Sequence, residues 1–265
     1  MNAHFTASQL LEDDYEDEVK DLLLDPFDRA VANMSAEEAY ELALSGERTP
    51  VTDLAVLKDP EWAYNYARGI IKGRWPEAEP LFMQDPELAY VYACDVIGGR
   101  WPEAESTILR YPGWAYNYAR YVIKERWPEA EPVIMKYPGW AYNYARGIIK
   151  GRWPEAEPYV MQDPHWAYYY ARDVIQGRWT EAEPVISQSP EWAFRYSSSV
   201  IGGRWPEAEP VISQDPKWAF RYARDIISGR WPEAEPVIVQ YPGWAYNYAR
   251  YVIQGRWPEA GINEL

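Results

Sequence analysis

The residues best suited to chemistry in this 265-residue chain are two glutamates that recur at a fixed spacing. Glu77 and Glu79 lie in the octet GRWPEAEP at residues 73–80, and this octet or a near-copy occurs eight times, 26 residues apart. Paired carboxylates can act as a general acid and a general base. Eight equivalent active sites along one chain would be unusual, so we expect these glutamates to pair with Arg68 and Arg74 or with their counterparts one repeat along. The pattern predicts no catalytic residue and no enzyme.

Other groups that bind metals or carry out nucleophilic catalysis are scarce. The chain has two histidines, His4 and His165, and one cysteine, Cys94. These are too few for a histidine–cysteine zinc site, and His165 stands at a position that varies between repeats. There is neither a glycine-rich phosphate loop nor a G-x-S-x-G motif. We therefore expect no metal and no cofactor.

The charge of the chain is acidic and uneven. The formal net charge is −15, and residues 1–33 carry nine acidic against two basic residues. A nucleic-acid backbone requires a basic surface, so nucleic acid is not an expected partner. A basic protein partner is compatible with this charge.

The expected compartment follows from what the sequence lacks. A single cysteine allows no intrachain disulfide, which is typical of a reducing compartment. The first residues have no basic and apolar pattern of a secretory signal, and no apolar run approaches the roughly 18 residues that span a bilayer. We expect a soluble cytoplasmic protein without a membrane association.

The elements that position these residues form a repeating helix pair. In residues 59–84, Asp59 is a suitable N-cap and Pro60 a suitable first helical residue. Gly73 is the expected left-handed residue that ends this long helix. A second, short element starts at Pro76. Its internal Pro80 removes a hydrogen bond, so we expect the element to be partly 3₁₀.

A fixed period of 26 residues with this punctuation predicts an all-α fold. We expect an α-solenoid of eight helix-pair repeats, here numbered 1 to 8. They begin at Asp59, Asp85, Tyr111, Tyr137, Asp163, Ser189, Asp215 and Tyr241.

Within the long helix, the positions that differ between repeats fall on one arc of a helical wheel. This variable stripe consists of Glu61, Asn65, Gly69 and Lys72 and their equivalents. The near-constant positions, which include most of the aromatic residues, cover the remaining arc and are predicted to be buried. Repeats that stack on each other must keep the residues that pack between them. Only the exposed positions are therefore free to differ from one repeat to the next.

Three segments are expected. Residues 1–34 form an acidic N-terminal helical segment, in which residues 7–24 are expected to make an amphipathic helix docked on the first repeat. Its acidic face is either solvated or a patch that binds a partner or imitates phosphate. Residues 35–58 read as a degenerate capping repeat, with Ser35 and Glu38 as a capping box and Gly46 at the helix end. Residues 59–265 hold the eight repeats.

The candidate binding residues are the charged, amide and aromatic side chains that stand on or beside the variable stripe. Arg195 and Arg221 place positive charges on neighbouring repeats where other repeats have Asn, and both are predicted to be exposed. Variation on this stripe would also arise by neutral drift on a solvated face. The full candidate set is Glu61, Asn65, Tyr121, Tyr169, Arg195, Lys217, Arg221 and Tyr251.

The repeat motif WAYxYARxxIxGRWPEAEP resembles a family of short tandem helical repeats associated with tailed-phage genomes. The resemblance covers residues 59–260 and extends in weaker form to about residue 35. It implies a phage protein that acts inside a bacterium, and it supplies no functional residues. More distantly, the unit is similar to tetratricopeptide and HEAT-type helix pairs, which are longer.

The function expected first is a non-enzymatic protein-binding scaffold, such as a phage adaptor or inhibitor that engages a host protein. One alternative is an acidic decoy that occupies a nucleic-acid-binding site. Another is a binder of small ligands through aromatic pockets.

Overall fold

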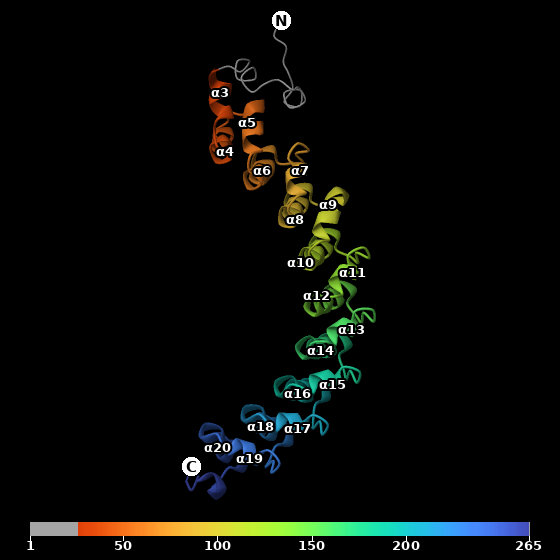
Figure 1. Cartoon of the computed structure of the whole chain (residues 1–265), viewed down its shortest axis with the longest axis vertical. Helices are drawn as coiled ribbons and strands as arrows, with labels where there is room; N and C mark the ends of the chain where they lie inside the picture. The colour runs from red at the N-terminus through yellow and green to blue at the C-terminus, as the bar shows by residue number, and fades with distance from the viewer. Residues whose placement is uncertain (1–25, 265) are drawn as a thin grey trace. The chain divides into compact units, whose positions relative to one another are not determined.

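The computed structural model describes residues 26–264, so the helix expected at 7–24 lies outside the described residues. The chain divides into two compact units, Met1–Lys124 and Glu125–Leu265. Figure 1 labels the helices, and the boundary falls within repeat 3. Each unit is described by itself.

The first unit begins with α3 (Pro26–Ala32), α4 (Ala36–Leu44) and α5 (Pro50–Val56). Its helices in repeats 1 to 3 are α6 (Pro60–Tyr66) with η1 (Ala67–Ile71), α7 (Glu79–Phe82), α8 (Pro86–Tyr92) with η2 (Ala93–Ile97), α9 (Pro102–Ile108), and α10 (Pro112–Asn117) with η3 (Tyr118–Ile123). The long helices α6, α8 and α10 pack side by side in order.

The second unit repeats the same arrangement. Its elements are α11 (Glu131–Ile134), α12 (Pro138–Tyr144) with η4 (Ala145–Ile149), α13 (Glu157–Val160), α14 (Pro164–Tyr170) with η5 (Ala171–Ile175), α15 (Glu183–Ile186), α16 (Pro190–Tyr196) with η6 (Ser197–Ile201), α17 (Glu209–Ile212), α18 (Pro216–Tyr222) with η7 (Ala223–Ile227), α19 (Glu235–Ile238), α20 (Pro242–Tyr248) with η8 (Ala249–Ile253), and η9 (Pro258–Ala260). The long helices α12, α14, α16, α18 and α20 again pack in order.

The predicted fold class is confirmed: the protein is an all-α solenoid of tandem helix pairs. Residues 26–264 contain no strand, and their one isolated β-bridge joins Trp257 to Ile262. In the same part of the chain, every helix is too short or too polar to cross a bilayer.

The four long helices that follow an aspartate begin as the sequence predicts, with a side-chain cap and a proline at the first position. The carboxylate of Asp59 accepts hydrogen bonds from the backbone N–H groups of Glu61 and Trp62, and Pro60 is the first helical residue. The carboxylate satisfies donors that have no partner within the helix. Ser35 and Glu38 likewise form the predicted capping box at the start of α4.

The predicted end of the long helix is wrong by one residue. The left-handed residue is Lys72, with φ of 56°, whereas Gly73 is not left-handed. The helix widens over η1 to a π-helix, and the N–H of Lys72 bonds to the carbonyl of Ala67, five residues back. This wider turn places the reversal one residue before the glycine. Glu125 takes that glycine's place in repeat 3, which is the signal that glycine is not required there.

Proline sets the length of the short helix. Six repeats have proline at the position of Pro80, and in repeat 1 α7 starts only at Glu79. Repeat 2 has Ser106 there, and α9 runs back to Pro102. Serine retains the N–H that proline lacks, so the helical hydrogen bonds begin earlier. The predicted start at Pro76 and the predicted 3₁₀ stretch are wrong, because residues 76–78 form a turn and the helix starts at Glu79.

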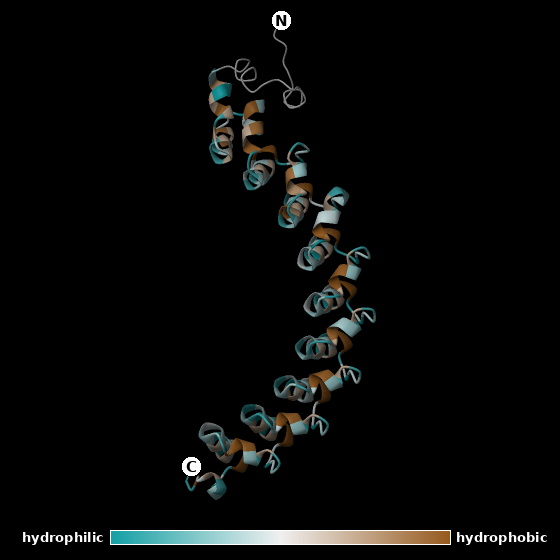
Figure 2. Cartoon of the chain, in the orientation of Figure 1, coloured by the Kyte–Doolittle hydropathy of each residue, from teal (hydrophilic) through white to brown (hydrophobic). Residues whose placement is uncertain are grey.

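The core consists of the same positions in every repeat. Ala63, Tyr66 and Ala67 are fully buried, and Trp75 is 5% exposed. The other tryptophan, Trp62, is only half-buried, in contrast to the predicted burial of the whole constant arc. Figure 2 shows hydrophobic residues concentrated on the short helices, beside the long ones.

Candidate binding surface

The recurring glutamate pair is divided between two environments. Glu79 is nearly buried, and both of its carboxylate oxygens accept hydrogen bonds from Arg74, from Nε and Nη2 at 2.8 Å each. Glu77 is exposed. The predicted pairing with Arg74 is confirmed. The predicted pairing of Arg68 with glutamate is wrong, because the Nε of Arg68 lies 3.6 Å from Asp95.

A tyrosine of the next repeat completes this ion pair. The hydroxyl of Tyr92 accepts the backbone N–H of Trp75 at 2.7 Å and donates to Oε1 of Glu79 at 3.2 Å. We call this set of Arg74, Glu79, Trp75 and Tyr92, with its equivalents, the repeat lock. A backbone N–H of tryptophan donates in the same way to the hydroxyls of Tyr118, Tyr144, Tyr170, Tyr196, Tyr222 and Tyr248. Glu79 therefore takes part in the contact between neighbouring repeats.

The electrostatics of the lock follow from burial and ion pairing. Burial raises the pKa of Tyr92 to about 12. The hydrogen bond from Arg204 lowers the pKa of Glu209, the equivalent of Glu79 in repeat 6. The hydrogen bond with Glu79 raises the pKa of Arg74, and the carboxylate of Glu103, one repeat along, adds a smaller attraction. In repeat 6 these effects favour a charged Arg204–Glu209 pair and a protonated Tyr222 hydroxyl, whose pKa burial raises to about 12.

The capping segment contains the ion pair and the tyrosine of this lock, whereas the backbone N–H at the tryptophan position, that of Thr49, bonds to Thr52. Arg48 pairs with both oxygens of Asp53, and the hydroxyl of Tyr66 in repeat 1 donates to Asp53. These three residues have the spacing of Arg74, Glu79 and Tyr92. Thr49 occupies the place of the buried tryptophan.

The predicted binding residues fall into three places on the long helices. Tyr121 and Tyr251 are exposed, by 54% and 50%, beside Arg120 and Arg250 respectively. Glu61 is exposed and Asn65 half-buried on α6. Tyr169, Arg195, Lys217 and Arg221 are half-buried on α14, α16 and α18, so the arginines are less exposed than the sequence predicts.

Three of these cations converge on one tryptophan. Arg195, Lys217 and Arg221 lie over the ring of Trp218, at 5.8, 4.4 and 5.1 Å from its centroid. Arg195 also lies over Trp192 and pairs with Glu191 at 2.9 Å. The structure thus brings Arg195 of repeat 6 together with Lys217 and Arg221 of repeat 7 around one ring.

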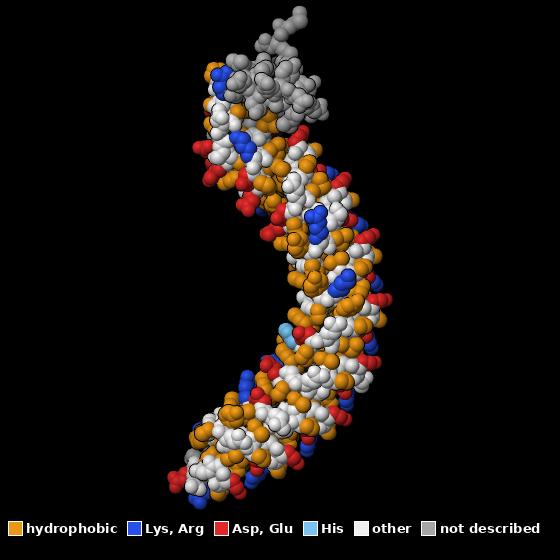
Figure 3. Space-filling model, in the orientation of Figure 1, with side chains coloured by type: hydrophobic (Ala, Val, Ile, Leu, Met, Phe, Trp, Pro, Cys, Tyr) orange, Lys and Arg blue, Asp and Glu red, His pale blue; other side chains and the backbone are white. Residues whose placement is uncertain are grey.

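An aromatic cluster precedes them along the second unit. His165 is stacked between Trp166 and Trp192, with ring centroids 4.4 and 4.6 Å away. Tyr169 meets the edge of His165 and carries the guanidinium of Arg172 at 4.6 Å. Figure 3 shows histidine in pale blue beside hydrophobic side chains in orange on this unit. The histidine serves in packing between repeats.

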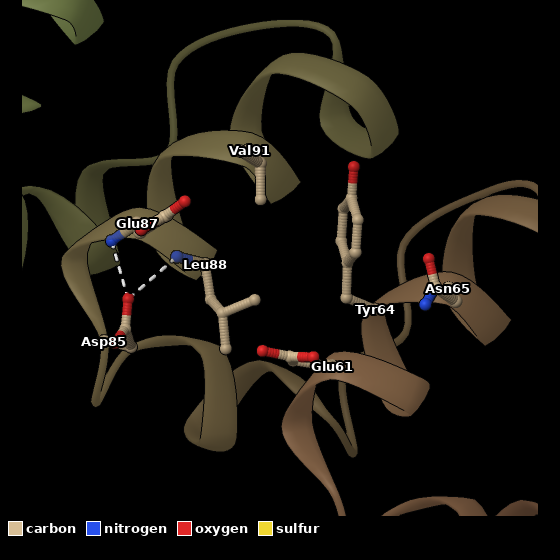
Figure 4. A pocket seen from close by; sticks show the side chains of 7 residues that line it. All are labelled: Glu61, Tyr64, Asn65, Asp85, Glu87, Leu88 and Val91. Carbon is tan, nitrogen blue, oxygen red and sulfur yellow. Dashed lines mark hydrogen bonds between the residues drawn. The ribbon is translucent and has the colours of Figure 1, made fainter. Parts of the chain in front are cut away.

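A pocket of about 390 Å³ lies between α6 and α8 in the first unit. Figure 4 shows Leu88 and Glu87 on α8 facing Tyr64 and Glu61 on α6 across it. Repeat 2 is the one repeat with leucine at the position of the first tryptophan, and this substitution is the signal by which the pocket could have been predicted. Its lining is Glu61, Tyr64, Asn65, Asp85, Glu87, Leu88 and Val91.

Three exposed tyrosines were not among the predicted binding residues. Tyr111, Tyr137 and Tyr241 are 50–54% exposed and stand where four other repeats have the capping Asp and repeat 6 has Ser189. They make no side-chain cap bond. The motif YPG in place of DPE marks them in the sequence.

The class of protein is thus an α-solenoid whose long helices carry an individualised face. Comparison of the chain with protein-family models, curated proteins and solved structures gives no match. Among residues 26–264 no group of His, Cys, Asp and Glu side chains could hold a metal ion.

Proposed function

We propose that this protein is a non-enzymatic binding scaffold that recognises a protein partner through the variable stripe and the aromatic residues beside it. The observation that carries the proposal is a contrast within each repeat. The lock and the buried Ala63, Tyr66 and Trp75 positions recur nearly unchanged, whereas the exposed and half-buried positions on the long helices change their charge and size. In solenoids, the surface whose residues differ between repeats, while the packing residues stay constant, is the usual binding surface.

The composition of this surface supports a protein as the partner. Half-buried Trp, Tyr and Arg side chains, which dominate binding energy at protein interfaces, occur together on α14, α16 and α18. The resemblance to tailed-phage repeats supports the narrower proposal of an adaptor or inhibitor that engages a host protein in the bacterial cytoplasm. The net charge of −15 favours a basic partner.

Affinity capture from a bacterial lysate tests the proposal. The full chain is the bait, and a chain with Arg195→Glu and Arg221→Glu is the matched second bait. We expect one stoichiometric protein on the first bait and less of it on the second. Capture of no protein would refute the scaffold, and displacement of the captured protein by DNA would favour the acidic decoy.

A further inference from the structure

The pocket between α6 and α8 lacks two groups that the equivalent site in repeats 6 and 7 contains. There, Arg195 lies over Trp218 and pairs with Glu191. In repeats 1 and 2 the equivalent residues are Asn65, Leu88 and Glu61. The carboxylate is retained, but the guanidinium and the indole are replaced by smaller side chains.

The walls of the pocket are suited to a planar cation. In five other places a Tyr or Phe at the position of Tyr64 stacks on the next repeat's tryptophan, as Tyr90 does on Trp114 at 5.4 Å. Leu88 offers Tyr64 no ring. The hydroxyl of Tyr64 donates to Asp95 at 2.6 Å, so this ring is held in place at the pocket. A guanidinium stacks on an aromatic face of this kind.

The charge of the pocket is entirely negative. Glu61, Asp85 and Glu87 line it, and no basic side chain does. One oxygen of Asp85 is occupied by the N–H groups of Glu87 and Leu88. At the site in repeats 6 and 7, by contrast, Lys217 and Arg221 stand in place of Glu87 and Val91. The two sites have opposite charges on the same backbone.

We propose that the pocket between α6 and α8 binds an arginine side chain of a protein partner. The guanidinium stacks on Tyr64 and pairs with Glu61, as Arg195 pairs with Glu191 within this chain. The volume of about 390 Å³ lies within the roughly 300–1,000 Å³ typical of ligand sites. The inference rests on the proposed function only in assigning the arginine to a protein.

The test is an NMR titration of the full chain with a blocked tripeptide, acetyl-Gly-Arg-Gly-amide. We expect saturable shifts at the amides of residues 61–65 and 85–91, weakened by salt. The same peptide with citrulline, the neutral isostere of arginine, should bind at least ten-fold more weakly. Equal binding of both peptides, or shifts elsewhere only, would overturn the proposal.

Two variants of the chain complete the test. Leu88→Trp restores the residue of the other repeats, and it should abolish the shifts while raising the unfolding midpoint. Glu61→Gln, at an exposed side chain, should weaken binding about three-fold or more without a change in the midpoint. Retention of wild-type affinity in Leu88→Trp would contradict the assignment of the pocket.

The source of the arginine is tested separately. Free L-arginine lacks the flanking peptide groups, and the opposite charges of its α-ammonium and α-carboxylate offset each other beside Glu61 and Glu87, so it should bind no more tightly than the blocked peptide. Tighter binding of the free amino acid would overturn the assignment to a protein partner. If the peptide binds but lysate capture yields no protein, the proposed function fails and the pocket's preference for guanidinium stands. If a protein is captured equally by wild type and Leu88→Trp, the pocket proposal fails and the scaffold stands.

Discussion

The hydroxyl of Tyr92 and the backbone N–H of Trp75, 17 residues apart in the chain, form a buried hydrogen bond of 2.7 Å. The bond joins the long helix of one repeat to the start of the preceding short element. A side-chain hydroxyl thus accepts the hydrogen bond from this buried N–H, in place of the backbone carbonyl that would accept it within a helix. The same geometry in seven repeats makes this lock the connection between neighbours, beside their apolar packing.

Removal of one lock should destabilise the protein. Tyr144→Phe deletes the hydroxyl that pairs with the N–H of Trp127 and with Glu131. An unsatisfied buried N–H costs about 1–3 kcal/mol, and the denaturation midpoint of the second unit should fall accordingly. Tyr246→Phe is the control, because Tyr246 is exposed and repeats 6 and 7 already have Phe there. Equal midpoints for both variants would contradict a stabilising role for the lock.

Two adjacent glycines should respond differently to the same substitution. Gly202 has φ of 73°, and Gly203 is not left-handed. A left-handed non-glycine residue costs roughly 1–2 kcal/mol, so Gly202→Ala should lower the thermal midpoint. Gly203→Ala, whose added Cβ meets nothing within 4 Å, should not lower it. The converse variant Gln176→Gly should raise stability by a few tenths to about 1 kcal/mol. A larger loss of stability for Gly203→Ala than for Gly202→Ala would contradict the assignment of the left-handed conformation to Gly202.

Alkaline pH should unfold the solenoid through its tyrosines. Burial raises the pKa of Tyr118, Tyr144 and Tyr222 from 10.0 to about 12. A group whose folded pKa is raised stabilises the fold fully below its unfolded pKa, and this contribution is lost as pH rises through the folded value. Stability should therefore fall between about pH 10 and 12. Tyrosinate absorbance followed together with circular dichroism measures it. Ionisation of all tyrosines near pH 10 with helicity intact would contradict the prediction.

Charge reversal at the cluster on Trp218 should weaken partner binding. The double variant Arg195→Glu and Arg221→Glu should reduce affinity about ten-fold, or 1.4 kcal/mol. Since both arginines lie over Trp218, we also expect a stability loss of about 0.5–1 kcal/mol for each contact. Lys136→Glu, at an exposed residue in the turn between α11 and α12, is the charge control. Calorimetric titration with the captured partner is the measurement, and unchanged affinity would exclude this part of the stripe.

Exchange of one proline should change the length of a short helix. Pro158→Ser in α13 restores a backbone N–H, so the helix should extend back to Pro154, as α9 extends to Pro102. Carbon chemical shifts at residues 154–156 would report the change. Ser106→Pro should produce the reverse effect in α9. Unaltered shifts in both variants would mean that tertiary packing, and not proline, limits the helix.

The features that the sequence determined by itself are local ones. The 26-residue period can be read directly from the sequence. The cap at Asp59 with Pro60 and the loss of a helical hydrogen bond at Pro80 depend on residues within about one turn of each other, so they can be predicted without knowledge of the fold. The pairing of Arg74 with Glu79 spans five residues and was predictable for the same reason.

The tertiary structure decided what depends on neighbouring repeats. The last turn of the long helix is a π-helix, and the left-handed residue that follows it is Lys72. The position of Gly73 in the sequence therefore does not decide alone where the helix ends. Packing of one repeat on the next buried Trp75 but left Trp62 half-buried, and it joined Tyr92 to Trp75. The pocket beside Tyr64 also needs two repeats, since Leu88 leaves a gap only where the preceding helix faces it. Such contacts join residues more than 16 positions apart, and only the stacked helices bring them together.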